Sequence, residues 1–294
     1  MLSHYHTSIN LDEENDAHSS LLRMVGFNKR VLEAGCASGH VSEALSGQGC
    51  SVVGIEIDSA VVQPAEQWVE RVIIGNFDDG VLWKELEDEF FDAVLFGDVL
   101  EHLKDPLATL QESIKHLHAS GAVIISVPNI AHADVKIALL KGKFPYSDSG
   151  LLDRTHIHFF TKESLLELVK TAGLVPIEFV RVTVPAFTTE IGVSKDDVDE
   201  HVVDAILADR ESETYQFVIK AVRDDGSRSL ENLSQDLIGL TDKLADEQRR
   251  YAALAVMYEA NLKDLSHLRR QMEAAKRWLP KPLRRLARKL LRQG

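Results

Sequence analysis

Cysteine and long apolar runs are both scarce in this chain of 294 residues. Its two cysteines, Cys36 and Cys50, are too few for a disulfide framework and fit a reducing compartment. No apolar run approaches the roughly 18 to 20 residues that a membrane span needs, and the opening residues, MLSHYHTSINLDEEND, lack the basic and apolar regions of a signal peptide. We therefore expect a cytoplasmic protein with one full domain and an appendage.

Acidic residues are absent from segment 276–294, which carries eight lysines and arginines. The rest of the chain holds the other 25 basic residues and all 46 acidic ones, so it should repel polyanions, and nucleic acid is disfavoured as a partner. Leucines gather on one face of the segment 276–294, as in helices that lie on anionic membranes. This basic amphipathic tail predicts a peripheral location at the inner face of a membrane; a solvated charged terminus is the alternative.

Apolar runs alternate with helical patterns through the first half of the chain. Such alternation predicts an α/β fold with a parallel, doubly wound sheet, whose strands are covered on both faces. A capped helix at 161–172 and two further strands complete a set of seven. The expected strands are 30–35, 51–56, 71–74, 91–96, 122–127, 176–184 and 214–222. The other expected helices are 40–46, one from the exit of the fourth strand to about 117, and a short one near 134–141.

The C-terminal part of the chain has a different pattern. A polar linker, 224–229, separates a domain of residues 1–223 from a segment in which apolar residues recur at alternating spacings of three and four. This heptad pattern covers 230–275, with polar exceptions at Glu247 and Asn261, and predicts a coiled coil that makes the protein a homo-oligomer. A long helix folded back on the domain is the alternative.

A glycine turn stands between the first strand and the first helix of this pattern. The segment VLEAGCASGHVSEAL (31–45) places Gly35 at the strand exit and Gly39 before the helix, where free N–H groups face a ligand. The spacing E-x-G-x-x-x-G differs from the dinucleotide form G-x-G-x-x-G, which counts against NAD. Glu56 ends the second strand, where an acidic side chain can accept hydrogen bonds from ribose hydroxyls.

Four motifs in order resemble those of class I S-adenosylmethionine-dependent methyltransferases. They are EAGCASG (33–39), GIEID (54–58), GNFD (75–78) and FDAVL (91–95). The resemblance covers about residues 18–223 and implies a Rossmann-like seven-stranded sheet with the last strand antiparallel. It also implies S-adenosylmethionine as the cofactor.

The resemblance assigns the cofactor pocket residue by residue. It implies that the glycine turn lines the methionine part of the cofactor, that Glu56 holds the ribose, and that Ile57 packs on the adenine. Asn76 and Phe77 are implied at the adenine edge, although position 76 is commonly Asp in this family. The complete set of implied cofactor-binding residues is Glu33, Gly35, Cys36, Gly39, Glu56, Ile57, Asn76, Phe77 and Asp98.

Two polar clusters mark the side of the pocket where a methyl acceptor would enter. The first, GDVLEHL (97–103), places three ionisable side chains at spacing i, i+3 and i+4, on one face if the chain is helical there. The second is DRTHIHFFT (153–161). The candidate catalytic residues in the two clusters are Asp98, His102, His156 and His158.

Three interpretations of these clusters stay open. A histidine with a carboxylate that orients it can act as a general base on a hydroxyl acceptor. Alternatively, the cluster can bind a divalent cation, Mg²⁺ or Mn²⁺, that lowers the pKa of the acceptor hydroxyl. In the third interpretation, the carboxylate and ring only cap a helix and shape the rim of the cofactor site.

The metal interpretation rests on a second resemblance. The pattern D-x-x-E-H followed by H-x-x-x-x-T resembles small-RNA 2′-O-methyltransferases, with Asp98 where those enzymes have Glu. This resemblance implies four metal ligands, which are Asp98, Glu101, His102 and His156. The acidic body of the chain does not support an RNA substrate.

A third resemblance concerns the acceptor. The second cluster, with SVPN (126–129), resembles methyltransferases associated with bacterial surface polysaccharides. We therefore expect an O-methyltransferase that acts on a sugar hydroxyl of a surface glycan or its precursor, with 129–155 as a lid. The alternatives are a small-molecule or quinone-type O-methyltransferase, and a cofactor-binding scaffold that acts through its coiled coil.

Overall fold

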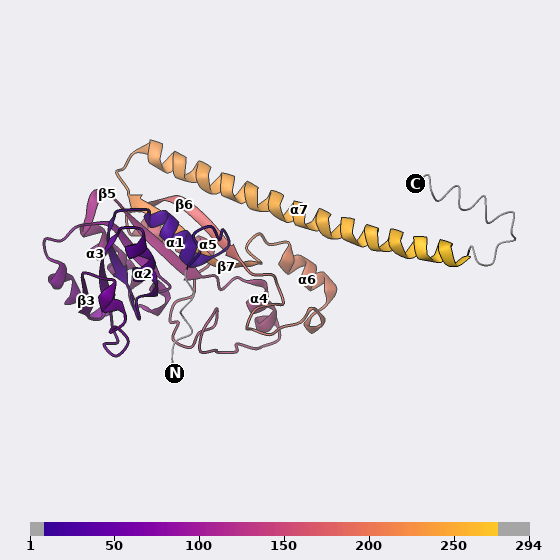
Figure 1. Ribbon diagram of the computed structural model, residues 1–294, viewed down its shortest axis with the longest axis horizontal. Helices are drawn as coiled ribbons and strands as arrows, with labels where there is room; N and C mark the ends of the chain where they lie inside the picture. Colours follow the sequence, from indigo (N-terminus) through magenta and orange to yellow (C-terminus); the bar gives the residue numbers. More distant parts are fainter. Residues whose placement is uncertain (1–8, 276–294) are drawn as a thin grey trace. The chain divides into compact units, whose positions relative to one another are not determined.

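Seven strands form one mixed sheet in the computed structural model, which describes residues 9–275 (Figure 1). The apolar runs of the sequence become these strands, and six of the seven both begin and end within two residues of the expected bounds. The exception is β5, which begins five residues earlier than expected. The strands are β1 (Arg30–Ala34), β2 (Ser51–Glu56), β3 (Arg71–Ile74), β4 (Phe91–Gly97), β5 (Leu117–Pro128), β6 (Leu174–Thr183) and β7 (Thr214–Arg223).

The strand order is β3-β2-β1-β4-β5-β7-β6. The first five strands pair in parallel, and β7 pairs antiparallel with both β5 and β6. The expected seven-stranded sheet with an antiparallel last strand is therefore confirmed. Because the order reverses between β1 and β4, a crevice opens there at the carboxyl ends of the strands, which is where open α/β sheets bind ligands.

Helices cover both faces of this sheet. Side chains of α1 and α2 pack on one face, and those of α3 and α5 pack on the other, which gives two separate apolar cores. Side chains of Asp16, Asp105 and Thr161 cap α1, α3 and α5, and Thr161 forms a capping box with Ser164. The helices are α1 (Ala17–Val25), α2 (His40–Gly47), α3 (Pro106–Lys115), α4 (Ala133–Leu140), α5 (Lys162–Thr171), α6 (Glu200–Leu207) and α7 (Arg228–Ala275).

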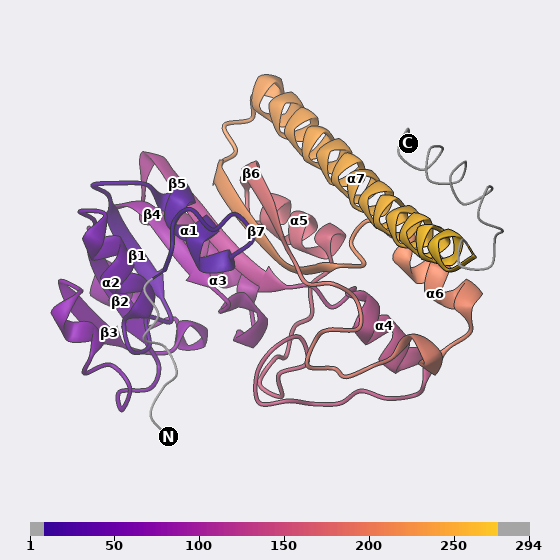
Figure 2. The ribbon, with the colours of Figure 1, turned by 45° about the vertical axis from the view of Figure 1, so that its right-hand side comes forward.

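Two excursions of the chain, 129–160 and 184–213, form a lobe beyond the carboxyl end of β5, where α4 and α6 lie side by side (Figure 2). The buried carboxylate of Asp134 ties the excursions together, because it accepts hydrogen bonds from the N–H of Phe187 and from the N–H and hydroxyl of Thr189. Asn129, also buried, donates to the carbonyls of Glu211 and Thr214. The expected lid is thus anchored at several points.

The prediction that a helix begins directly after β4 is wrong. The chain makes only a 3₁₀ turn over Leu100–His102 before α3 begins at Pro106, because Asp105 caps that helix and proline favours its first turn. Asp98 adopts a left-handed conformation with φ of 53° and lies outside the turn. The i, i+3, i+4 argument therefore does not place Asp98, Glu101 and His102 on one helical face.

The chain divides into a first compact unit that ends at Thr241 and a second that begins at Asp242. The division falls inside α7, which runs without interruption over 48 residues and covers the heptad segment. The domain bounds 1–223 and 230–275 stay predictions. Segment 276–294 lies outside the described residues. Within residues 9–275, no helix has the combination of length and apolar character that crossing a membrane requires.

Candidate active site

The glycine turn after β1 depends on close packing between loops. Gly35 and Gly39 both have positive φ, at 69° and 85°. A Cβ on Gly39 would lie 2.6 Å from the Cα of Ala65, and one on Gly35 would lie 2.9 Å from a methyl group of Val99. The glycines are therefore needed to bring neighbouring segments against the turn. The N–H groups of Gly35, Cys36 and Gly39 donate to backbone carbonyls, so they are not the free groups that the sequence predicted.

Glu56 organises the same turn from the end of β2. Its carboxylate accepts hydrogen bonds from the N–H groups of Ala37, Ile57 and Asp58, at 2.9, 2.9 and 3.0 Å. A carboxylate has about four acceptor positions, so capacity remains for a ligand hydroxyl. The side chain thus both holds the loop and faces the crevice where the cofactor is expected.

Two further residues of the turn are buried beside Glu56. Glu33 accepts a hydrogen bond from the Ser42 hydroxyl. Burial, and then the charge of Glu56, raise the pKa of Glu33 to about 7, against the effect of that hydrogen bond. Burial and the same two carboxylates raise the pKa of the Cys36 thiol to about 12, so the thiol stays protonated and is no nucleophile at neutral pH.

The residues implied at the adenine occupy different environments. The Ile57 side chain is 65% exposed at the rim of the crevice, as an apolar surface for a ring would be. Asn76 accepts from the N–H of Asp78 through its side chain and so caps a short turn. The Phe77 ring packs in the core against Trp83 and Phe96, which leaves its backbone as the part available to a ligand.

Asp98 lies at the exit of β4 and is held by the two next strands. Its carboxylate accepts from the Ser126 hydroxyl at 2.9 Å and from the Gln216 amide, which donates to both oxygens at 2.9 Å. These partners were not predicted, because the contact with Gln216 joins residues 118 positions apart, one just after β4 and one in β7, and these two strands are separated by β5 in the sheet. The implied cofactor role of Asp98 stays a prediction.

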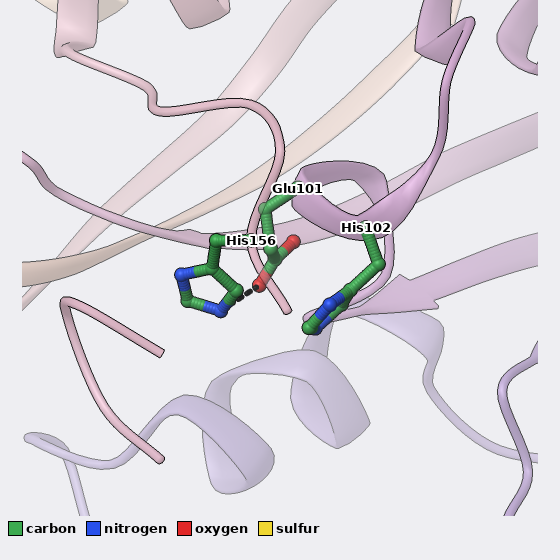
Figure 3. A group of neighbouring side chains, drawn as sticks. All are labelled: Glu101, His102 and His156. Carbon is green, nitrogen blue, oxygen red and sulfur yellow. Dashed lines mark ion pairs between the residues drawn. The ribbon is translucent and has the colours of Figure 1, made fainter. Parts of the chain in front are cut away.

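Glu101, His102 and His156 converge at the side of the crevice (Figure 3). One donor atom from each lies within 4.8 Å of the others, a grouping that fits a metal ion. The backbone explains the convergence, because the carbonyl of Glu101 accepts from the N–H groups of Ile157 and His158. The structure does not bring the Asp98 carboxylate into this group.

The Glu101 carboxylate is 1% exposed, and neither of its oxygens accepts a hydrogen bond within residues 9–275. The side chain that could form an ion pair with it is His156, whose Nε2 lies 3.9 Å from the Glu101 Oε1. Burial, and then the nearby charge of Asp98, raise the pKa of Glu101 well above its ordinary value. Burial, and then His102, lower the pKa of His156, so this contact is not an ion pair at neutral pH. A buried carboxylate of this kind needs a proton or a cation.

Thr155 determines which nitrogen of His102 is free. The Thr155 hydroxyl donates to Asp153 at 2.6 Å and therefore accepts from the Nδ1–H of His102 at 3.1 Å. Burial opposes the ionisation of Asp153, but the bonds from Thr155 outweigh it and lower its pKa. This chain of contacts leaves the Nε2 lone pair of His102 available to a cation or an acceptor proton.

Thr155 was missed as a functional residue, although it stands inside the DRTHIHFFT segment. His158 lies apart from the cluster, since its Nε2 contacts the Lys104 carbonyl at 3.2 Å and its ring stacks near Phe160. Of the four catalytic candidates, the structure brings His102 and His156 together and places Asp98 and His158 elsewhere on the rim.

A protein-family model described as a methyltransferase domain matches residues 13–178, which is more than half of the chain. The chain belongs to this methyltransferase family. Its methyl donor is S-adenosylmethionine. The matched range contains the glycine turn, Glu56, the β4 exit and the Glu101–His156 group.

Solved structures support the fold of the methyltransferase. A methyltransferase dependent on S-adenosylmethionine, from Archaeoglobus fulgidus, superposes with a TM-score of 0.51 at 20% identity, over 69% of this chain and 91% of that one. The class I methyltransferase fold is thereby confirmed.

Curated relatives of the methyltransferase carry a common name. A ubiquinone biosynthesis O-methyltransferase from Psychrobacter arcticus is 28% identical over 167 residues, which are 53% of this chain and 63% of that protein. One from Pasteurella multocida is 31% identical over 113 residues, which are 34% of this chain and 47% of that protein. The chain therefore spans less than two thirds of the length of each.

Replacing Glu56 by Gln should weaken binding of S-adenosylhomocysteine at least tenfold, because a charged acceptor for the ribose is lost. Calorimetric titration measures the affinity, and thermal unfolding reports the smaller cost of disturbing the three backbone hydrogen bonds. The control is Asp58→Asn, which makes the same charge change at an exposed neighbour. Equal affinity of Glu56→Gln and the wild type would remove Glu56 from the ribose role.

Replacing Glu33 by Gln should flatten the pH dependence of stability. Since the folded-state pKa is raised from 4.5 to about 7, the stabilisation from the bound proton is full below pH 4.5 and is lost as pH rises through 7. The wild type should lose about 3 kcal/mol over this window from this group, and Glu33→Gln should not. Urea unfolding between pH 4.5 and 7.5 measures this, with the exposed Glu43→Gln as the control. An unchanged slope in Glu33→Gln would contradict the assignment.

Proposed function

We propose that the protein is a metal-assisted O-methyltransferase that acts on a small aromatic acceptor with adjacent hydroxyl groups, of the quinone-precursor type. The observation that carries this proposal is the buried carboxylate of Glu101, which accepts no hydrogen bond from residues 9–275 and lies beside the imidazoles of His102 and His156. In the transfer, the acceptor oxygen forms a bond to the methyl carbon as the carbon–sulfur bond breaks, and the hydroxyl proton must leave.

The donor set fits a divalent cation. Glu101, His102 and His156 would hold it, and Thr155 with Asp153 would keep the Nε2 of His102 directed to it. Bound there, such a cation would lower the pKa of an acceptor hydroxyl and orient two adjacent oxygens. Two imidazoles with one carboxylate favour Mn²⁺ over Mg²⁺, which prefers oxygen ligands.

Aromatic side chains beside this group support a planar acceptor. The ring of Phe159 lies 6.3 Å from that of His156 and 5.8 Å from that of Phe144, which in turn lies 5.0 Å from Tyr146. Phe159 and Tyr146 are exposed, so they offer ring faces and edges to a ligand at the crevice. These aromatic side chains form an apolar surface beside the imidazoles of His102 and His156, and such a combination suits an aromatic diol.

The relatives named for ubiquinone biosynthesis favour this acceptor over the surface glycan expected from the sequence. Neither of these two relatives is named for polysaccharide synthesis. We therefore propose the aromatic diol as the acceptor and use a sugar hydroxyl as the competing acceptor in the test below.

Replacing Glu101 by Gln should weaken Mn²⁺ binding at least tenfold and lower kcat/KM with an aromatic diol about a hundredfold, because one anionic ligand is lost. Calorimetry with Mn²⁺ alone and a methyl-transfer assay measure the two effects. The control is His118→Ala, which removes an exposed imidazole from β5. Full activity in a chelator would reject the metal and leave His102 as a metal-free base.

An acceptor panel tests the substrate class. A 1,2-dihydroxybenzene with an alkyl substituent should be methylated at least tenfold more efficiently than its monohydroxy analogue, since two oxygens orient it. Phe159→Leu should raise KM for this acceptor with little change in the affinity for S-adenosylhomocysteine. Faster methylation of a vicinal-diol sugar than of the aromatic diol would reverse the proposed choice of acceptor.

A further inference from the structure

The longest exposed apolar surface in the described chain lies on α7 and has no role in the proposed chemistry. α7 spans 48 residues, or about 70 Å. Nine large apolar or aromatic side chains at heptad positions are exposed along it. They are Leu233, Leu240, Leu244, Tyr251, Leu254, Tyr258, Leu265, Leu268 and Met272. Monomeric soluble proteins rarely expose a continuous apolar stripe of this kind.

The stripe has the spacing of a coiled-coil seam. Alternating steps of three and four from Leu230 to Met272 assign the a and d positions of the heptads. The seam stays open where the helix meets its own domain, since Ser234 on the flank is buried while Leu233 and Leu240 are 66% and 61% exposed. A second helix is the partner that such a seam fits.

Glu247, one of the two polar residues of the seam, decides the direction of that second helix. In a parallel pair of identical chains in register, Glu247 faces Glu247 of the second copy at a d position. Two carboxylates in an apolar seam repel each other and lose hydration. The antiparallel arrangement avoids this contact, because a positions then face d positions of the second copy.

One antiparallel register uses the whole seam. With Tyr251 facing Leu254 of the second copy at the centre, Leu240 faces Leu265 and the first and last turns of the seam still overlap. Glu247 then faces Tyr258, whose phenol O–H can donate to the carboxylate. Asn261 faces Leu244 in two symmetry-related layers, which are the ones that this register leaves unfavourable.

Charges beside the seam agree with this register. In antiparallel coiled coils the g positions of the two helices face each other, and here Lys243 faces Asp264 twice in each dimer. Both side chains are exposed. A shift of one heptad in one direction places Arg250 against Arg250 and Asp236 against Asp264, which repel. A shift in the other direction places Glu247 against Leu265 and leaves the ends of the seam uncovered.

We propose that the protein forms a homodimer through an antiparallel two-helix coiled coil of α7, centred between Tyr251 and Leu254. The partner is a second copy of this chain because the seam is complementary to itself under a two-fold rotation, in both shape and charge. This inference is independent of the acceptor and of the metal.

Cysteine cross-linking tests the direction of the helices in the full chain. Leu240→Cys and Leu265→Cys are made as separate variants, mixed, and oxidised. The mixture should give a covalent dimer and neither variant alone should, because identical positions lie about 37 Å apart in an antiparallel pair. The native Cys36 and Cys50 are buried. Cross-linking of either variant with itself would instead show a parallel pair and overturn the proposal.

A charge exchange outside the apolar seam keeps the test valid if the cysteine variants fold poorly. Lys243→Glu should raise the dimer dissociation constant about tenfold, and adding Asp264→Lys should restore it. Lys263→Glu, on the outer face of the same helix, is the matched control and should change it less than twofold. Sedimentation measures each mass against 32.8 kDa for one chain. A monomer at 100 μM, a higher oligomer, or no restoration would overturn the proposal.

Discussion

Two backbone hydrogen bonds hold the candidate active site together. The carbonyl of Glu101 accepts from the N–H groups of Ile157 and His158, at 2.9 and 3.0 Å, and so fastens the second polar segment to the exit of β4. His156 reaches Glu101, and Thr155 reaches His102, because of this attachment. The same contact brings the aromatic side chain of Phe159 to the rim. Without it, residues more than 50 positions apart would have no common site.

The glycine turn and the polar group meet because of the sheet order. Since β1 and β4 are neighbours, Gly35 at the end of one strand packs against Val99 just after the other. The methyl donor and the acceptor groups are thereby built on adjacent strand ends, on rigid elements rather than on long loops. A Cβ at Gly35 would push Val99 and, with it, the turn that carries Glu101.

The sequence predicted the sheet well because its signal is local. The apolar run 51–56 matches β2 residue for residue, since burial along the strand leaves no polar interruption before Glu56. The run 71–74 matches β3 as well, although that edge strand is largely exposed. The membership of Glu101, His102 and His156 in one cluster was also expected, from the resemblance to small-RNA 2′-O-methyltransferases. Thr155, which orients His102, and Gln216, which holds Asp98, were not predicted, because they are ordinary polar residues whose contacts arise only between distant parts of the chain. Asp98 was misplaced because a positive φ in a non-glycine residue has no sequence signature.

Polar residues in apolar surroundings have different effects in the two parts of the chain, affinity for a ligand in one and specificity of pairing in the other. In the catalytic domain, the Glu101 carboxylate is buried and accepts no hydrogen bond from the part of the chain that the structure describes. Its desolvation is offset only when a cation or proton arrives, so the cost is a source of affinity. In α7, Glu247 and Asn261 interrupt an apolar seam, and their cost differs between alternative alignments, so it becomes a source of specificity. A seam of leucine alone would pair in several registers. The polar exceptions weaken every alignment, and they weaken the antiparallel alignment centred between Tyr251 and Leu254 least.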